Sequence, residues 1–168
     1  MSERPSFEEV YRSSFSFVWR NVLRLGTDPS SVDDVVQEIF LVVHRKLPEF
    51  EGRAALKTWL FAIVRRVVSD HRRSRKRKPS EATDDLDHLG EHESSESKVE
   101  AFDLVNRLLE ELDEEKREVF VLAELEELTM AEISEMTGVN ANTVAARLRA
   151  ARKVFAAAVR EHDDGAAT

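Results

Sequence analysis

Apolar residues recur every three to four positions through most of this chain, and that spacing is the strongest constraint on its fold. It is the period of an α-helix with one buried face, whereas a half-buried strand would alternate apolar and polar residues. Glycine and proline, which interrupt helices, number only 5 and 4 among the 168 residues. The sequence therefore predicts an all-α protein.

The first block of helical periodicity predicts a three-helix domain over residues 5–78. The segment Ser6–Glu9 has the spacing of a capping box, and the helix that it opens should end at Gly26. A second helix should end before Pro48, and a third should begin near Ala55. Each helix has an apolar face, so the three can bury one core.

Residues 79–97 predict a flexible acidic linker, because they contain few apolar groups whose burial could offset chain entropy. A short helix over 84–89 is the alternative. Helical periodicity returns over residues 98–160 and predicts a second small helical domain. In that domain Asp113 can cap a helix, and Thr129–Glu132 repeats the capping-box pattern.

The formal net charge of −8 argues against a protein that binds nucleic acid through excess positive charge alone. The charges are nevertheless segregated. Arg65–Lys78 is strongly basic with Asp70 as its only acid, an acidic stretch follows, and basic residues return in the last third. This pattern indicates separate surfaces for different partners.

Several classes of function find no support in the residues. The chain has no cysteine, which excludes a disulfide framework, a thiolate nucleophile and a cysteine-based zinc site. It also lacks the H-E-x-x-H motif, a phosphate-binding loop and a serine elbow, so we expect no metal, no cofactor and no enzymatic activity. No signal core or membrane span is apparent, so we expect a cytoplasmic protein without membrane insertion.

The clearest local motif is TMAEISEMTGVNANTVAARLRAARK, residues 129–153. A capped short helix, a turn at Gly138 and a second amphipathic helix are typical of a helix-turn-helix, although an ordinary helical hairpin is the alternative. In a major groove, Arg149 suits a guanine edge and Asn142 an adenine edge. The candidate DNA-contacting residues are Asn142, Thr143, Ala145, Ala146, Arg147, Arg149, Arg152 and Lys153.

The second predicted helix carries one polar strip on an otherwise apolar circumference. The strip comprises Asp33, Asp34, Gln37, Glu38 and Leu41, most of which share one helix face through i, i+3, i+4 and i+7 spacing. It is either a solvated stripe or a docking face for a helical partner, with Leu41 as an apolar anchor. The residues alone favour neither interpretation.

The segment FEGRAALKTWLFAIVRRVVSDHRRSRKRK joins an aromatic-rich loop to a basic helix. A surface that suits a phosphate backbone is predicted from Arg65, Arg66, Ser69, Arg72 and Arg73. Exposed aromatic rings beside it could stack on unpaired bases. For Trp59 we favour packing in the core, whereas Phe50 and Phe61 fit either role.

Together, the Gln-Glu helix, the F-x-G…TWL segment, the basic helix, the acidic linker and the C-terminal helix-turn-helix resemble one family. It is the extracytoplasmic-function (ECF) branch of the bacterial sigma factors, and the resemblance covers about residues 6–158. It implies that residues 5–78 are sigma region 2 and residues 98–160 are sigma region 4. It further implies a transcription-initiation factor that binds core RNA polymerase (β′ clamp and β flap), promoter DNA and an anti-sigma factor.

The resemblance also implies roles for individual residues. The strip Asp33–Leu41 would dock on the polymerase clamp, and residues 142–153 would read the minus-35 element. Contacts to the minus-10 element would come from Phe50, Glu51, Gly52, Arg53, Lys57, Thr58, Arg65, Arg66, Ser69, Asp70 and Arg73. The chain departs from residues frequent in the family at Ala62, Arg66, Ala145 and Ala146, which bears on promoter preference.

Two other functions stay open at this stage. A helix-turn-helix regulator that works without polymerase would bind duplex DNA tightly by itself, with strong salt dependence. The acidic total charge and the separate Gln-Glu helix count against it. A protein that binds polymerase without reading a promoter gains some support from the alanine-rich second helix of the motif. We favour the sigma factor.

Overall fold

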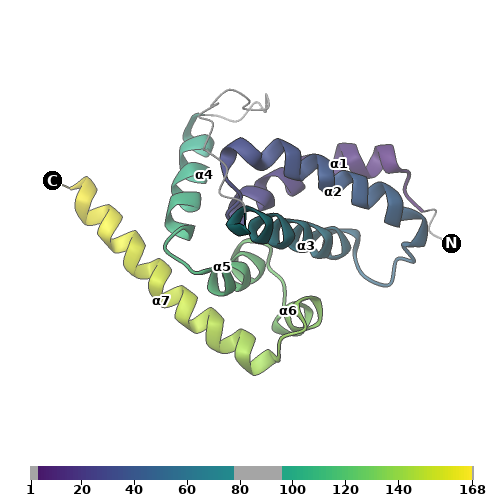
Figure 1. Cartoon of the computed structure of the whole chain (residues 1–168). Coiled ribbons are helices and arrows are strands. Elements are labelled where there is room, and N and C mark those ends of the chain that lie inside the picture. The colour runs from purple at the N-terminus through teal and green to yellow at the C-terminus, as the bar shows by residue number, and fades with distance from the viewer. Residues whose placement is uncertain (1–3, 78–95, 168) are drawn as a thin grey trace. The chain divides into compact units, whose positions relative to one another are not determined.

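The computed structural model describes residues 4–77 and 96–167, which are helical with short turns and contain no strand (Figure 1). The all-α prediction is therefore confirmed. The chain divides into two compact units between residues 88 and 89, and each is described by itself. Within the described ranges, no helix has the length and apolar character needed to cross a membrane.

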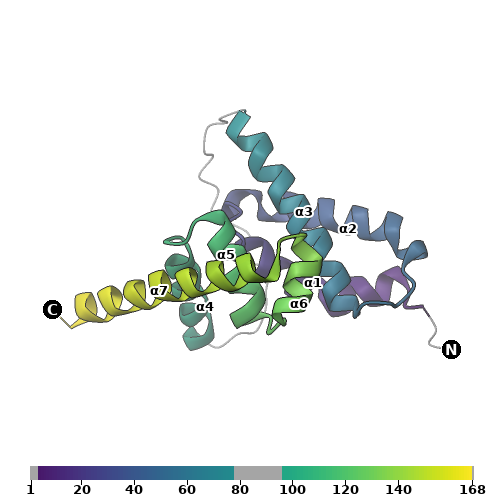
Figure 2. The same cartoon turned by 90° about the horizontal axis from the view of Figure 1, so that it is seen from below.

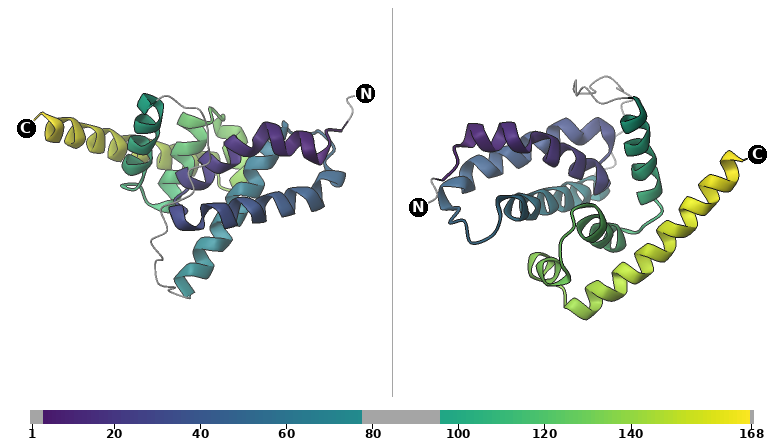
Figure 3. Two further views of the ribbon diagram at one scale, coloured as in Figure 1. Left: turned by 90° about the horizontal axis from the view of Figure 1, so that it is seen from above. Right: turned by 180° about the vertical axis from the view of Figure 1, so that it is seen from behind.

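The first unit is a three-helix bundle of α1 (Phe7–Arg24), α2 (Val32–Lys46) and α3 (Leu56–Arg77). Two short 3-10 turns, η1 (Pro29–Ser31) and η2 (Leu47–Glu49), join the helices. Each helix packs against the other two (Figure 3). Their apolar faces meet in one core, whose most deeply buried side chains include Val10, Val18, Val22, Val35, Ile39, Val43, Leu60, Phe61 and Val64.

The ends of α1 are set by the residues that the sequence indicated. The Ser6 hydroxyl accepts a hydrogen bond from the Glu9 amide at 3.2 Å, and the Glu9 carboxylate accepts one from the Ser6 amide at 2.8 Å. Gly26 follows the helix with a φ of 91°, in the left-handed region that glycine adopts without strain. Before α2, Asp28 caps η1 by accepting a hydrogen bond from the Ser30 amide at 3.0 Å.

The second unit contains α4 (Glu96–Leu109), α5 (Glu114–Phe120), a π-helical turn η3 (Val121–Leu125), α6 (Met130–Thr137) and α7 (Ala141–Ala166). The long helix α7 packs on α4, α5 and α6 (Figure 2). The core of this unit comprises Leu109, Leu112, Val119, Phe120, Val121, Leu122, Ile133, Val144, Leu148 and Ala151.

The turn between α6 and α7 is built from local hydrogen bonds. Thr129 and Glu132 form the predicted capping box, with amide-to-side-chain bonds of 2.7 and 3.2 Å. Gly138 ends α6 with a φ of 69°. Asn140, which the sequence analysis did not single out, then caps α7 by accepting a hydrogen bond from the Asn142 amide at 2.8 Å. These bonds give the two helices of the predicted helix-turn-helix defined ends.

The predicted linker, residues 79–97, falls almost entirely outside the described residues, as does its alternative helix over 84–89. Its last two residues, Glu96 and Ser97, are helical and begin α4. At the other end of the unit, α7 continues past residue 160 to Ala166.

We expect the capping boxes to make the stability of the fold depend on pH below about 4.5. Hydrogen bonds from the Thr129 amide and hydroxyl lower the pKa of Glu132 from its ordinary value of 4.5, and Ser6 acts in the same way on the pKa of Glu9. A carboxyl group with a lowered pKa stabilises the folded state above its unfolded pKa. That contribution is lost as the pH falls through the folded pKa.

Urea unfolding followed by circular dichroism at pH 7 and pH 3 measures this effect. Glu132→Gln should lose less free energy of unfolding between the two pH values than the wild type loses. The control Glu135→Gln removes an exposed carboxylate from the same helix and should behave like the wild type. An identical pH dependence in all three proteins would contradict the role given to Glu132.

Candidate polymerase-docking and nucleic-acid interfaces

The polar strip of α2 lies on the surface of the first unit. All of its members are exposed, namely Asp33, Asp34, Gln37, Glu38 and Leu41. Leu41 is 59% exposed, whereas Ile39 and Val43 on the other side of the helix are completely buried. A helix held firmly in the core thus presents one apolar side chain among acids and an amide. Such an exposed apolar group with a polar rim suits a docking surface.

The predicted loop before α3 is exposed and strongly bent at Gly52, which has a φ of 72°. No atom lies within 4 Å of the position that a Cβ would occupy there, so the backbone conformation and not packing calls for glycine. Beside it, Arg53 Nε lies 2.7 Å from Glu51 Oε2 in an exposed ion pair. The loop therefore offers backbone and charged groups to solvent next to the start of α3.

The aromatic residues of this segment divide between core and surface. Phe61 is 1% exposed and is a core residue, which decides between its two predicted roles. Trp59 is partly buried, and its ring packs against that of Phe50 with a centroid distance of 5.0 Å, so the choice between core packing and base stacking stays a prediction. Lys57 Nζ lies 5.4 Å from the Phe17 ring, within cation–π range. The half-exposed pair of Phe50 and Trp59 is thus the aromatic surface next to the loop.

The basic face of α3 carries arginines in different surroundings. Arg66 and Arg73 are exposed, and Arg65 is half-buried. Arg73 Nη2 donates a hydrogen bond to Ser69 Oγ at 3.2 Å, and its Nη1 lies 3.9 Å from Asp70 Oδ1. Ser69 and Asp70 therefore hold the Arg73 guanidinium along the helix surface, about two turns after Arg65 and Arg66.

Arg72 serves the fold, a role that the sequence analysis did not give it. Its Nη1 donates a hydrogen bond to the Leu25 carbonyl at 3.1 Å and so satisfies an acceptor left open at the end of α1. The buried residues Val64 and Val68 are spaced by one helical turn, and the next position in that row is Arg72. The helical spacing from Val64 and Val68 could have indicated that the Arg72 side chain points toward the core. We overlooked it because Arg72 stands in a run of basic residues that we interpreted as one exposed surface.

The outer face of α7 is open to solvent. Val144 and Leu148 are buried on its inner face. Ala145 is half-buried, and the exposed candidates are Asn142, Thr143, Ala146, Arg149, Arg152 and Lys153. Because the alanine side chains are small, the first turns of the helix can approach the groove of duplex DNA closely.

Two of the candidate arginines of α7 form ion pairs with glutamates of the same unit. Arg147 Nη2 lies 3.1 Å from Glu115 Oε2. Arg152 places both Nε and Nη2 against Glu124 Oε1, at 2.6 and 2.5 Å. The sequence analysis did not anticipate these pairs, because Glu124 and Arg152 are 28 positions apart in the chain.

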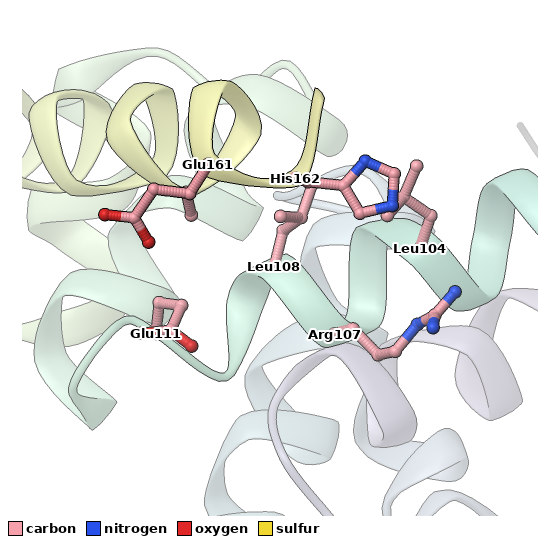
Figure 4. A pocket seen from close by; sticks show the side chains of 7 residues that line it. Leu104, Arg107, Leu108, Glu111, Glu161 and His162 are labelled. Atoms are coloured by element: carbon pink, nitrogen blue, oxygen red, sulfur yellow. The ribbon is translucent and has the colours of Figure 1, made fainter. Parts of the chain in front are cut away.

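A shallow hollow of about 320 Å³ lies between α4 and the C-terminal part of α7 (Figure 4). Leu104, Leu108 and Ala158 line it, together with charged groups. The Arg107 guanidinium is turned away from the Glu161 carboxylate in Figure 4, so the polar groups do not converge on one point. Among the described residues, no three His, Cys, Asp or Glu side chains gather in a metal-binding arrangement.

Comparison with known proteins matches both units to one family. The Sigma-70 region 2 family model matches residues 10–78, and the Sigma-70, region 4 family model matches residues 102–154. The ECF RNA polymerase sigma factor SigC of Mycobacterium tuberculosis is 30% identical over 153 residues, which are 90% of this chain and 82% of SigC. SigM of Bacillus subtilis is 25% identical over 154 residues, 90% of this chain and 94% of SigM.

Solved structures show the same fold. The sigma factor RpoE of Bartonella quintana, in complex with the anti-sigma factor NepR, matches with a TM-score of 0.73 and 19% identity, over 92% of this chain and 96% of RpoE. CnrH, in complex with the cytosolic domain of CnrY, matches with a TM-score of 0.67 and 21% identity, over 95% of this chain and 91% of CnrH.

Sigma regions 2 and 4, in this order on two helical units, define a bacterial sigma factor. The chain belongs to the ECF RNA polymerase sigma factors, as the sequence resemblance implied.

We expect Arg72→Ala and Arg66→Ala to separate the structural cations of α3 from the exposed ones. Arg72→Ala should cost about 1–3 kcal/mol of stability, because the Leu25 carbonyl loses its donor. Arg66→Ala should change stability by no more than about 0.5 kcal/mol, because that side chain is exposed. The two tryptophans, Trp19 and Trp59, both lie in the first unit, so urea unfolding followed by their fluorescence reports on it. Equal losses in the two variants would contradict this assignment.

Proposed function

We propose that this chain binds core RNA polymerase through the exposed strip of α2 and directs it to promoter DNA through α3 and α7. The observation that carries the proposal is the strip itself, with Leu41 exposed among acids on a helix whose other side is buried. The protein acts by binding and not by catalysis, and its partners are core polymerase and promoter DNA.

The strip has the properties of a helix-docking face. Burying the Leu41 side chain against a partner would contribute about 1–2 kcal/mol through the hydrophobic effect. Gln37 supplies a hydrogen-bonding amide beside it, and the carboxylates of Asp34 and Glu38 favour a partner surface with positive charge. Family membership makes the clamp of the polymerase β′ subunit the partner that we propose for this face.

For the minus-10 element, we propose that unpaired bases stack on the half-exposed rings of Phe50 and Trp59, while cations of α3 hold the phosphates. Stacking of a base on an aromatic side chain contributes about 1–3 kcal/mol, and extruding a base from a duplex costs a few kcal/mol. The two magnitudes are similar, so binding of the opened strand can offset the cost of opening it. The bend at Gly52, two residues after Phe50, lies in an exposed part of the chain whose backbone groups are open to solvent.

For the minus-35 element, we propose that α7 enters the major groove with its outer face. We propose Arg149 as the residue that reads a base edge. It is exposed, and the neighbouring Ala145 and Ala146 side chains are too small to keep the helix away from the groove. Lys153, one helical turn further on, is exposed and suits a phosphate.

An anti-sigma protein is the regulator that we propose. RpoE, whose fold this chain shares, was solved with the anti-sigma factor NepR. A protein that covers the strip of α2 would compete directly with polymerase for Leu41 and its neighbours.

Run-off transcription with bacterial core polymerase and supercoiled genomic fragments tests the proposal. The wild-type chain should give discrete transcripts, and changing Gln37, Glu38 and Leu41 together to alanine should reduce them at least about tenfold, since more than 1.4 kcal/mol of binding free energy is removed. The control Glu49→Ala removes an exposed acid outside the strip and should retain activity. If no transcript forms and the chain alone binds duplex DNA tightly, a polymerase-independent regulator replaces this function.

Arg149→Ala should relax specificity at one position of the upstream element, at a cost of about 1–3 kcal/mol. Lys153→Ala should instead weaken binding to all upstream sequences by a similar factor. It should also reduce the slope of log affinity against log salt concentration by about 1. Transcription from a promoter library randomised upstream distinguishes the two results. Uniform weakening by both variants would contradict base reading by Arg149.

A further inference from the structure

The cations of α7 divide into two groups by their position around the helix. Arg147 directly precedes the buried Leu148, and Arg152 directly follows the buried Ala151. At 3.6 residues per turn, each is rotated by about 100° from its buried neighbour, in opposite directions. The two arginines therefore lie at the two edges of the buried stripe. Arg149 and Lys153 project from the outer face.

Each edge arginine meets a glutamate from an element that precedes the helix-turn-helix. Glu115 lies in the first turn of α5, which packs on α7, and its partner Arg147 is only 25% exposed. Glu124 belongs to the π-helical turn η3 and is 35% exposed, and both Nε and Nη2 of Arg152 contact one of its oxygens. Glu115 is 67% exposed and Arg152 58%, so each pair joins one exposed and one more buried side chain and should contribute at most about 1 kcal/mol.

The outer cations have no such restraint. Over the described part of the chain, neither Arg149 nor Lys153 is engaged in a hydrogen bond or an ion pair, and both are exposed. Duplex DNA thus meets two cations that are available and two that are already neutralised. For Arg147 or Arg152 to bind a phosphate, the phosphate must displace a carboxylate or lie close to it, and either reduces the electrostatic gain.

We propose that Glu115 and Glu124 set the specificity of DNA binding by holding Arg147 and Arg152 in ion pairs. The pairs lower the affinity for duplex DNA of arbitrary sequence, which depends on phosphate contacts alone. They leave base reading by the outer face of α7 unaffected. The inference rests on the proposed function of α7 as the helix that reads the upstream element.

The test measures binding of the full chain to a duplex of arbitrary sequence by fluorescence anisotropy over a range of NaCl concentrations. Glu115→Gln and Glu124→Gln should each tighten this binding by about two- to fivefold at low salt. Each should also steepen the salt dependence, by about 0.9 in the logarithmic slope per arginine released. Binding of the polymerase holoenzyme to its upstream element should tighten less, so the ratio of specific to non-specific affinity should fall.

The control Glu114→Gln makes the same change of net charge one position from Glu115, at an exposed side chain of the same helical turn. It should leave the non-specific affinity close to that of the wild type. In the Glu115→Gln background, Arg147→Ala should remove the gain. Thermal unfolding followed by circular dichroism verifies that each variant is folded at the assay temperature.

The proposal is overturned if Glu114→Gln tightens binding as much as the other two variants, because the effect is then one of total charge. It is also overturned if Glu115→Gln and Glu124→Gln leave binding unchanged or weaken it, because the glutamates would then not compete with phosphate. If transcription by the wild-type holoenzyme ignores the upstream element, the proposed function of α7 fails together with this inference. If the wild-type holoenzyme recognises the upstream element but the glutamate variants bind non-specific DNA as the wild type does, only this inference is overturned.

Discussion

Burial of one apolar stripe on each helix is the interaction on which the rest of the structure depends. In α2 the stripe includes Ile39 and Val43, and in α7 it includes Val144, all completely buried. Branched side chains in a close-packed core fix the rotation of a helix about its own axis. The opposite faces are therefore presented to solvent at fixed spacing. A partner can bind such a face at little cost in conformational entropy, because the backbone is already ordered.

Arginine performs three tasks in this chain, and the surroundings of each side chain decide which. Arg72 and Arg117 donate hydrogen bonds to the Leu25 and Leu109 carbonyls, so each unit uses an arginine to satisfy an acceptor at the end of its first helix. Other arginines are paired on the surface with glutamates, and a third group is exposed. A count of basic residues would therefore overstate the charge that is available to nucleic acid.

Features governed by neighbouring residues were predictable from the sequence, and those governed by distant residues were not. The capping box of Thr129 and Glu132 spans three positions, so residue type and spacing determine it. The contact of Arg72 with Leu25 spans 47 positions and depends on how α1 and α3 pack. The π-helical turn η3 and the φ of 57° at Glu127 also escaped prediction, because neither glycine nor proline marks that segment. The exposure of Leu41 followed from helical phase alone, whereas the polymerase clamp that we propose as its partner rests on family membership.

The acidic net charge has different consequences for the free chain and for the chain bound to polymerase. With a net charge of −8 and two arginines of α7 held in ion pairs, we expect the free chain to have little electrostatic attraction for DNA of arbitrary sequence. In the proposed holoenzyme, polymerase supplies that attraction, and the sigma factor needs to supply only base discrimination. Two modest DNA contacts on one chain then reinforce each other, because binding of the first raises the effective concentration of the second. Under this proposal, weak binding by the chain alone would favour initiation at promoters, since a sigma factor that bound DNA tightly by itself would occupy sites without polymerase.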